Sequence, residues 1–207
     1  MRLKPIFSRH LDIDKMSFLN WRMESGETRN VLNLAEGYLT SAIQLSEICL
    51  FDNEDKKADI LIFPILANAN HALELYLKGL TIMLNEILDN NQKIEGTHNL
   101  KQLYNTLKAR IKELDGQRAL TELEGNFIEL TEYIEELVEK IDSTPQNDKM
   151  DFARYPFTKK YENHFYIDTF ENIEIDIENL KNRLEVLYEK LKSYSDYLFY
   201  NRLNESN

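Results

Sequence analysis

Polar side chains recur inside the most apolar stretch of the chain, residues 59–100. The first part of this stretch is almost continuously apolar, yet it carries His71, Glu74 and Lys78 at spacings of three and four. Those spacings place the three side chains on one face of a helix. Buried polar groups must be hydrogen-bonded within the protein or take part in binding or catalysis. The pattern therefore predicts either an internally paired His–Glu–Lys network or a binding face.

A second group of candidate residues lies in the aromatic-rich segment 151–170. Arg154 stands between Asp151 and Tyr155, and His164 follows further along the segment. A guanidinium offers a planar two-point fork to a phosphate, and a histidine transfers protons near neutral pH. The segment therefore predicts a small anion site with Arg154 and His164 as catalytic candidates and with Asp151 and Tyr155 as binding candidates. The alternative is that Arg154 ties this loop to Glu74 or to another carboxylate of the bundle.

His98 is a third catalytic candidate, because it lies at the start of a predicted helix opened by Thr97 or Asn99 as N-cap. Local capping or packing is the alternative role for this histidine. Motifs for other chemistries are missing from the sequence, which contains no CxxC, no HExxH and no Gly-rich phosphate loop. We therefore expect no metal and no cofactor, and we expect Cys49, on an apolar helical stripe, to be a core residue.

Composition bounds the class of protein. The 207 residues include only 6 Gly and 4 Pro, which favours an all-α fold. The net charge of −11 opposes a general nucleic-acid-binding face but leaves room for a local basic pocket. A single cysteine and the lack of a secretory signal indicate a cytoplasmic protein. Polar residues interrupt the longest apolar run, so we expect no membrane span.

Hydrophobic spacing divides the chain into an arm and a bundle. Residues 1–27 are predicted to be an irregular N-terminal arm, and residues 28–207 a helical bundle domain. The predicted helices cover residues 28–51, 58–88, 100–114, 118–141 and 174–200, with a turn at Asp115 and Gly116. The fold expected is an all-α, up-and-down bundle of about five helices, with the aromatic-rich loop packed on the bundle before the last helix. Because helix 58–88 is apolar on more than one face, we also predict a homodimer.

Three segments of the sequence resemble the HEPN superfamily of helical domains. The segment HALELYLKGL is followed after a short loop by THNLKQLY, and DFARYP is similar to a segment of HEPN-like proteins. The resemblance covers roughly residues 31–114. It implies a helical bundle that commonly dimerises. Many members are metal-independent ribonucleases of toxin–antitoxin and phage-defence systems, in which an Arg and a His act on RNA.

The ribonuclease motif of that superfamily is not recognisable in this sequence. In the family the Arg and the His are separated by four to six residues, whereas nine residues separate Arg154 from His164. The resemblance therefore implies a binding or regulatory module that has lost the motif, with an antitoxin-like protein as a potential partner. The alternative is an endoribonuclease with a changed site, in which Arg154 acts with His164 or with His98 on RNA.

Overall fold

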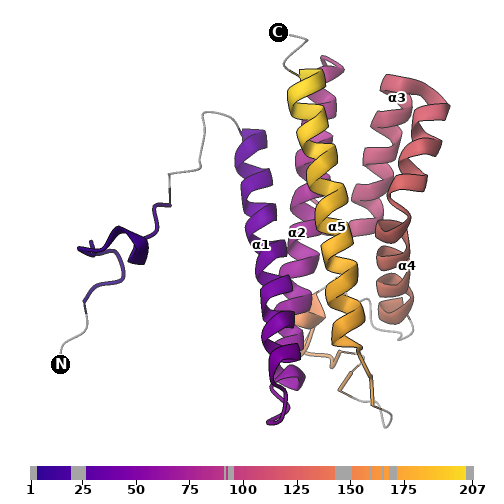
Figure 1. Ribbon diagram of the computed structural model, residues 1–207. Helices are drawn as coiled ribbons and strands as arrows, with labels where there is room; N and C mark the ends of the chain where they lie inside the picture. The colour runs from indigo at the N-terminus through magenta and orange to yellow at the C-terminus, as the bar shows by residue number, and fades with distance from the viewer. Residues whose placement is uncertain are drawn as a thin grey trace.

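The computed structural model describes residues 4–19, 27–90, 92, 96–142, 151–158, 160–164, 166–167 and 172–203 (Figure 1). The helices are α1 (Glu27–Phe51), α2 (Ala58–Ile87), α3 (Leu100–Asn126), α4 (Ile128–Asp142) and α5 (Ile177–Tyr197). Short turns of helix are η1 (Ile13–Lys15), η2 (Asp151–Ala153) and the π-helical η3 (Leu198–Leu203). Within the described residues there is no strand, so the predicted all-α bundle of about five helices is confirmed.

The central element of the bundle is α2. Half of its 30 residues are buried, and α1, α3, α5, η2 and η3 all pack on it (Figure 1). By length and composition alone, α2 would be able to cross a membrane. In this structure half of α2 is buried by other elements of the same chain, while Ile60 near its start is 73% exposed. Part of the apolar surface from which a homodimer was predicted is therefore covered within the chain, and the dimer stays a prediction.

The buried seam of α1 explains how closely it approaches α2. Buried residues recur along α1 at alternating spacings of three and four, the pattern of packed antiparallel or supercoiled helices. They are Leu32, Ala35, Leu39, Ala42, Ser46 and Cys49. Cys49 is 2% exposed, which confirms that it is a core residue. On α2, Gly79 faces this seam, since a Cβ there would lie 2.8 Å from Leu32 Cδ2.

Gly116 folds α3 back on itself. Its φ of 82° lies in the left-handed region that glycine adopts without strain. The two halves of α3 meet across the turn through an ion pair between Lys108 and Glu124 at 3.5 Å. Next to the turn, Asp115 accepts two 3.0 Å hydrogen bonds from Arg202 of η3. The turn predicted at residues 115–116 is thereby confirmed.

The returning helix has one break that the sequence did not predict. Residues 118–141 were expected to form one helix, but the backbone leaves the helical region at Phe127, with φ −106° and ψ 29°. The side chain of Phe127 is 2% exposed and meets the ring of Tyr194 edge-on, with the ring centroids 5.5 Å apart. The deviation coincides with insertion of this ring into the core, a tertiary contact that helical periodicity does not encode.

The segment between α2 and α3 returns along α2. Asp89 follows the C-cap Leu88 of α2 with a positive φ of 49°, and the side-chain amide of Asn85 donates to the Gln92 carbonyl at 3.0 Å. Gln92 in turn contacts Arg110 of α3. The first half of α3 therefore runs beside α2 in the same direction. Asn99 is the N-cap, accepting a hydrogen bond from the Gln102 N–H at 3.0 Å, so one of the two predicted caps is confirmed.

The described part of the aromatic-rich segment is ordered against the bundle. Phe152 and Ala153 of η2 are buried with Ile141 of α4. Tyr166 donates its hydroxyl to the Phe152 carbonyl at 3.1 Å, and its ring packs 5.3 Å from that of Phe63 on α2. The predicted packing of this loop is confirmed for these residues. Phe165 and Phe170, also expected to pack there, lie outside the described residues.

The predicted arm is described for residues 4–19. Nearly all of its side chains are exposed, including Phe7 at 87% and Leu19 at 78%. The structure begins α1 at Glu27, while residues 20–26 lie outside the described residues. The division into an arm of residues 1–27 and a bundle of residues 28–207 stays a prediction.

The close contact at Gly79 gives a test of the α1–α2 packing. We expect Gly79→Val to lower the free energy of unfolding by about 1–3 kcal/mol, because the added side chain overlaps Leu32. The matched control is Gly37→Val, since a Cβ at Gly37 meets nothing within 4 Å. The control should be neutral or slightly stabilising. Urea denaturation measures both, and equal effects of the two variants would contradict the packing described.

Candidate functional site

The candidate site is built around the carboxylate of Glu74, whose side chain is only 10% exposed. Lys78 Nζ lies 2.7 Å from Glu74 Oε1, and His98 Nδ1 lies 3.0 and 3.1 Å from its two oxygens. The Nδ1 atom of His71 is 4.0 Å from Glu74 Oε2. Four of the residues singled out in the sequence therefore meet at one buried carboxylate.

Three separate segments of the chain position these side chains. The middle of α2 supplies His71, Glu74 and Lys78 at helical spacing. His98 precedes the N-cap Asn99, and the N–H of that cap residue donates to the side chain of Thr97 at 3.1 Å. Arg154 follows η2, whose residues are anchored in the core next to α4. The site thus depends on packing between elements that are distant in the sequence.

A small cavity of about 30 Å³ lies between these segments. The residues lining it are Ala67, Asn70, His71, Glu74, His98, Leu100 and Arg154. The side chains of His71 and His98 are 40% and 65% exposed, so the cavity lies at the surface. The lining carries the anion Glu74 and the cation Arg154, and Lys78, which pairs with Glu74, lies outside the lining.

Burial and neighbouring charges set the protonation states at the site. Burial raises the pKa of Glu74, but hydrogen bonds from Lys78 and His98 outweigh it and hold that pKa below its ordinary value of 4.5. Burial lowers the pKa of His71 below 6.5. Glu74 opposes this shift, while the positive charge of Arg154 adds to it. At neutral pH, Glu74 is therefore ionised and His71 is neutral.

The pairing of His98 with Glu74 determines which ring nitrogen is available. An ionised carboxylate only accepts hydrogen bonds, so the Nδ1 atom of His98 must donate to it. In the neutral ring, Nε2 then carries the lone pair and can take up a proton. A carboxylate that fixes the tautomer and orientation of a histidine is a recurring arrangement in general acid–base catalysis. His98 is therefore the histidine best prepared for proton transfer at this site.

Asn70 belongs to the same cavity and was not chosen as a site residue from the sequence. Its side chain is buried, at 7% exposure, and its Oδ1 accepts a hydrogen bond from the Tyr133 hydroxyl at 2.9 Å. Its Nδ2 has no hydrogen-bond partner among the described residues. Its spacing in the sequence could have identified it, because Asn70, Glu74 and Lys78 follow one another at intervals of four and so share one face of the helix. The partner Tyr133, on α4, was not evident from the sequence.

Other predicted site residues lie apart from the cavity lining. His164 is 1% exposed and stacks on Tyr166 with the centroids 6.1 Å apart. The ring of Tyr155 is exposed and lies 5.9 Å from the Arg154 guanidinium carbon. The backbone of Asp151 belongs to η2, but its side chain lies outside the described residues. Of the two histidines offered as partners for Arg154, the cavity is lined by His98 and not by His164.

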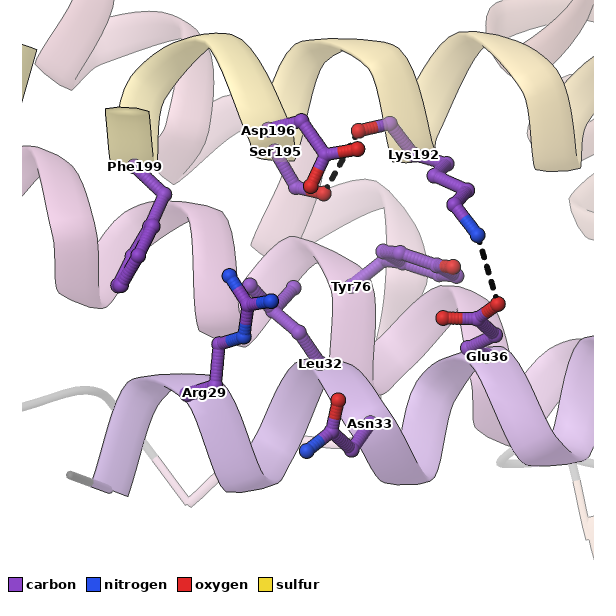
Figure 2. A pocket seen from close by; sticks show the side chains of 9 residues that line it. All are labelled: Arg29, Leu32, Asn33, Glu36, Tyr76, Lys192, Ser195, Asp196 and Phe199. Carbon is purple, nitrogen blue, oxygen red and sulfur yellow. Dashed lines mark hydrogen bonds and ion pairs between the residues drawn. The ribbon is translucent and has the colours of Figure 1, made fainter. Parts of the chain in front are cut away.

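A second cavity, of about 40 Å³, lies between α1, α2 and α5 (Figure 2). Its charged groups bridge the helices: Lys192 Nζ lies 2.8 Å from Glu36 Oε1, and Arg29 lies over the Phe199 ring at 4.7 Å. The side chain of Tyr76 is buried between them, and burial raises the pKa of its hydroxyl, which stays protonated. The volume suits one or two water molecules. The Lys192–Glu36 pair and the buried Tyr76 side chain join α5, α1 and α2 across this cavity.

Comparison of the chain with protein-family models, with curated proteins and with solved structures found no match. The resemblance to the HEPN superfamily rests on the sequence segments themselves and stays a hypothesis.

Removing the central carboxylate should destabilise the fold. We expect Glu74→Gln to lower the free energy of unfolding by about 1–3 kcal/mol, because Lys78 and His98 lose a charged acceptor in a partly buried site. The control is Glu122→Gln, which breaks the Arg118–Glu122 pair, also at an (i, i+4) spacing but largely exposed. The control should change stability by no more than about 0.5 kcal/mol. If Glu74→Gln changes the free energy of unfolding as little as the control does, the described pairing of Glu74 with Lys78 and His98 is contradicted.

The lowered pKa of His71 predicts a pH dependence of stability. A folded-state pKa below 6.5 means that the unfolded chain binds more protons as the pH falls. The neutral ring therefore contributes its full stability above pH 6.5, and that contribution is lost as the pH falls through the folded value. Urea denaturation of wild type and His71→Gln between about pH 5 and about pH 7.5 measures this. As the pH falls, wild type should lose more of its free energy of unfolding than the variant. If the free energy of unfolding depends on pH in the same way in both proteins, the lowered pKa of His71 is contradicted.

Proposed function

We propose that this chain is a HEPN-like helical domain of the cytoplasm that acts as a metal-independent endoribonuclease. The observation that carries the proposal is the pairing of His98 Nδ1 with Glu74, at 3.0 Å, in a cavity also lined by Arg154. This combination supplies an oriented base and a cation for a phosphate. Both are needed for cleavage by the RNA 2′-hydroxyl group, and neither requires a metal ion.

The chemistry proposed for His98 is removal of the proton from the RNA 2′-hydroxyl. The 2′ oxygen then attacks the adjacent phosphorus, and the bond from phosphorus to the 5′ oxygen of the next nucleotide breaks. The products are a 2′,3′-cyclic phosphate and a 5′-hydroxyl whose proton comes from water. Arg154 balances the charge that develops on the phosphate oxygens. Glu74 acts through His98 by holding its Nδ1.

This arrangement bears on the unusual Arg–His spacing of the sequence. In the superfamily motif, Arg and His come from one short segment, whereas Arg154 and His98 come from segments on either side of α3 and α4. The proposal is therefore that the pair is rebuilt in space from different parts of the chain. His164, which satisfies the order of the motif but not its spacing, is assigned no catalytic role.

A second candidate function is a binding or regulatory module without cleavage, pairing with a second copy or with an antitoxin-like protein. The engagement of Lys78 by Glu74 at 2.7 Å supports it, since that cation is already neutralised within the chain. The net charge of −11 supports it too, because a long RNA is repelled by most of the surface. Defence against phage, or a toxin–antitoxin role, is the biological setting that the HEPN resemblance suggests for either function.

RNA cleavage in the presence of EDTA tests the proposal. We expect purified wild type to cut unstructured RNA and to leave 2′,3′-cyclic phosphate ends. His98→Gln and Arg154→Ala should each reduce the rate by about 10²–10⁴-fold. The matched controls are His10→Gln on the arm and Arg118→Ala on the exposed part of α3. Both controls should cut at the wild-type rate.

The outcomes separate the two candidate functions. Cleavage that survives in both site variants would contradict the assigned site. Intact RNA that is nevertheless retained by wild type and lost by Arg154→Ala would favour the binding module over the endoribonuclease. Intact RNA that is not bound at all would remove RNA from both candidates.

A further inference from the structure

We propose that Asn70 is a phosphate-binding residue whose amide nitrogen donates a hydrogen bond to a phosphodiester oxygen in the 30 Å³ cavity. This inference rests on the proposed function and specifies its substrate. The cavity admits a phosphate oxygen but no base, so the substrate class is an RNA phosphodiester irrespective of the neighbouring bases.

The first argument is the state of the Asn70 side chain. It is 7% exposed and lines the cavity, and its Nδ2 has no hydrogen-bond partner among the described residues. Buried polar groups of native proteins are almost always hydrogen-bonded, and exceptions call for an explanation such as a ligand. A donor held ready for a ligand explains why this buried position of α2 carries an amide.

The second argument is the orientation of the amide. The Tyr133 hydroxyl is buried and donates to Asn70 Oδ1 at 2.9 Å, which leaves the nitrogen for a molecule in the cavity. Burial raises the pKa of the Tyr133 hydroxyl, so it keeps the proton that this hydrogen bond requires. The molecule in the cavity must therefore offer an acceptor. The same lining holds Arg154, whose guanidinium pairs with oxyanions, and the ionised carboxylate of Glu74, which Lys78 pairs with from outside the lining.

The third argument is size. A volume of about 30 Å³ exceeds the roughly 10–15 Å³ that a cavity needs in order to hold one water molecule. It accommodates one or two oxygen-sized atoms and excludes a nucleobase. A phosphate would reach Asn70 with one oxygen, while the sugar and bases stay outside the cavity beside His98 and Arg154, whose side chains are exposed. Recognition through this cavity therefore reads the backbone and not the sequence of the RNA.

Binding of inorganic phosphate, followed by isothermal titration calorimetry, tests the inference without relying on cleavage. Asn70→Asp keeps the shape of the side chain but replaces the donor with an acceptor. We expect it to weaken phosphate binding by about 10–100-fold. The matched control is Asn68→Asp, which adds the same charge two residues away on α2 at a half-buried position outside the cavity lining. The control should bind within about threefold of wild type.

A second variant keeps the test decisive where Asn70→Asp does not fold. Tyr133→Phe removes only the hydroxyl that orients the amide, so Tyr133 is tested as a positioning residue. We expect phosphate binding to weaken by about 3–10-fold through loss of the fixed amide orientation. In Tyr133→Phe combined with Asn70→Ala, the Tyr133 change should have no further effect on phosphate binding. An undiminished effect in the double variant would mean that Tyr133 acts only through general stability.

The outcomes for this inference differ from those for the proposed function. Phosphate binding that is lost in Asn70→Asp but kept in Asn68→Asp supports the inference even where wild type leaves RNA intact. In that case only the endoribonuclease proposal fails. Equal phosphate affinity of the two Asp variants, or no phosphate binding by wild type, would overturn the role of Asn70. Cleavage that depends strongly on the base beside the cut would overturn the assignment of a base-independent substrate.

Discussion

The interaction on which the structure depends is the burial of one carboxylate in an apolar helix. Glu74 lies in the middle of α2, the element around which the bundle packs, with only 10% of its side chain exposed. An ion in such a place is costly unless it is paired and hydrogen-bonded. Lys78 supplies one partner from the same helix. The second, His98, must come from elsewhere in the chain.

That requirement is met by the path of the backbone after α2. The chain turns back along α2 before α3 begins, and this return places His98 beside Glu74. The hairpin at Gly116 then carries the returning helix to α4, on which the η2 segment is anchored. Arg154 is the residue that follows η2 in the chain. The same path of the chain therefore pairs the buried carboxylate and brings Arg154 to the surface cavity beside it.

Local features of the sequence predicted much of this arrangement. The face shared by His71, Glu74 and Lys78, the turn at Gly116 and the cap at Asn99 all follow from spacing or from local backbone chemistry. The sequence did not show which histidine accompanies Arg154, because that pairing depends on the return of the chain along α2. The hydrogen bond from Tyr133 to Asn70 joins residues 63 positions apart and leaves no periodic signal. The break at Phe127 is likewise a response to tertiary packing.

The most direct measurement of the central claim is a nitrogen-edited NMR spectrum of the imidazole rings during addition of an uncleavable RNA. A dinucleotide methylated at the 2′ oxygen provides the phosphodiester without permitting attack. If the cavity beside Glu74 is the site, the Nε2 and ring-proton signals of His98 shift on binding, and those of the buried His164 do not. Shifts confined to His164, or no shift of His98 under saturating dinucleotide, would contradict the account.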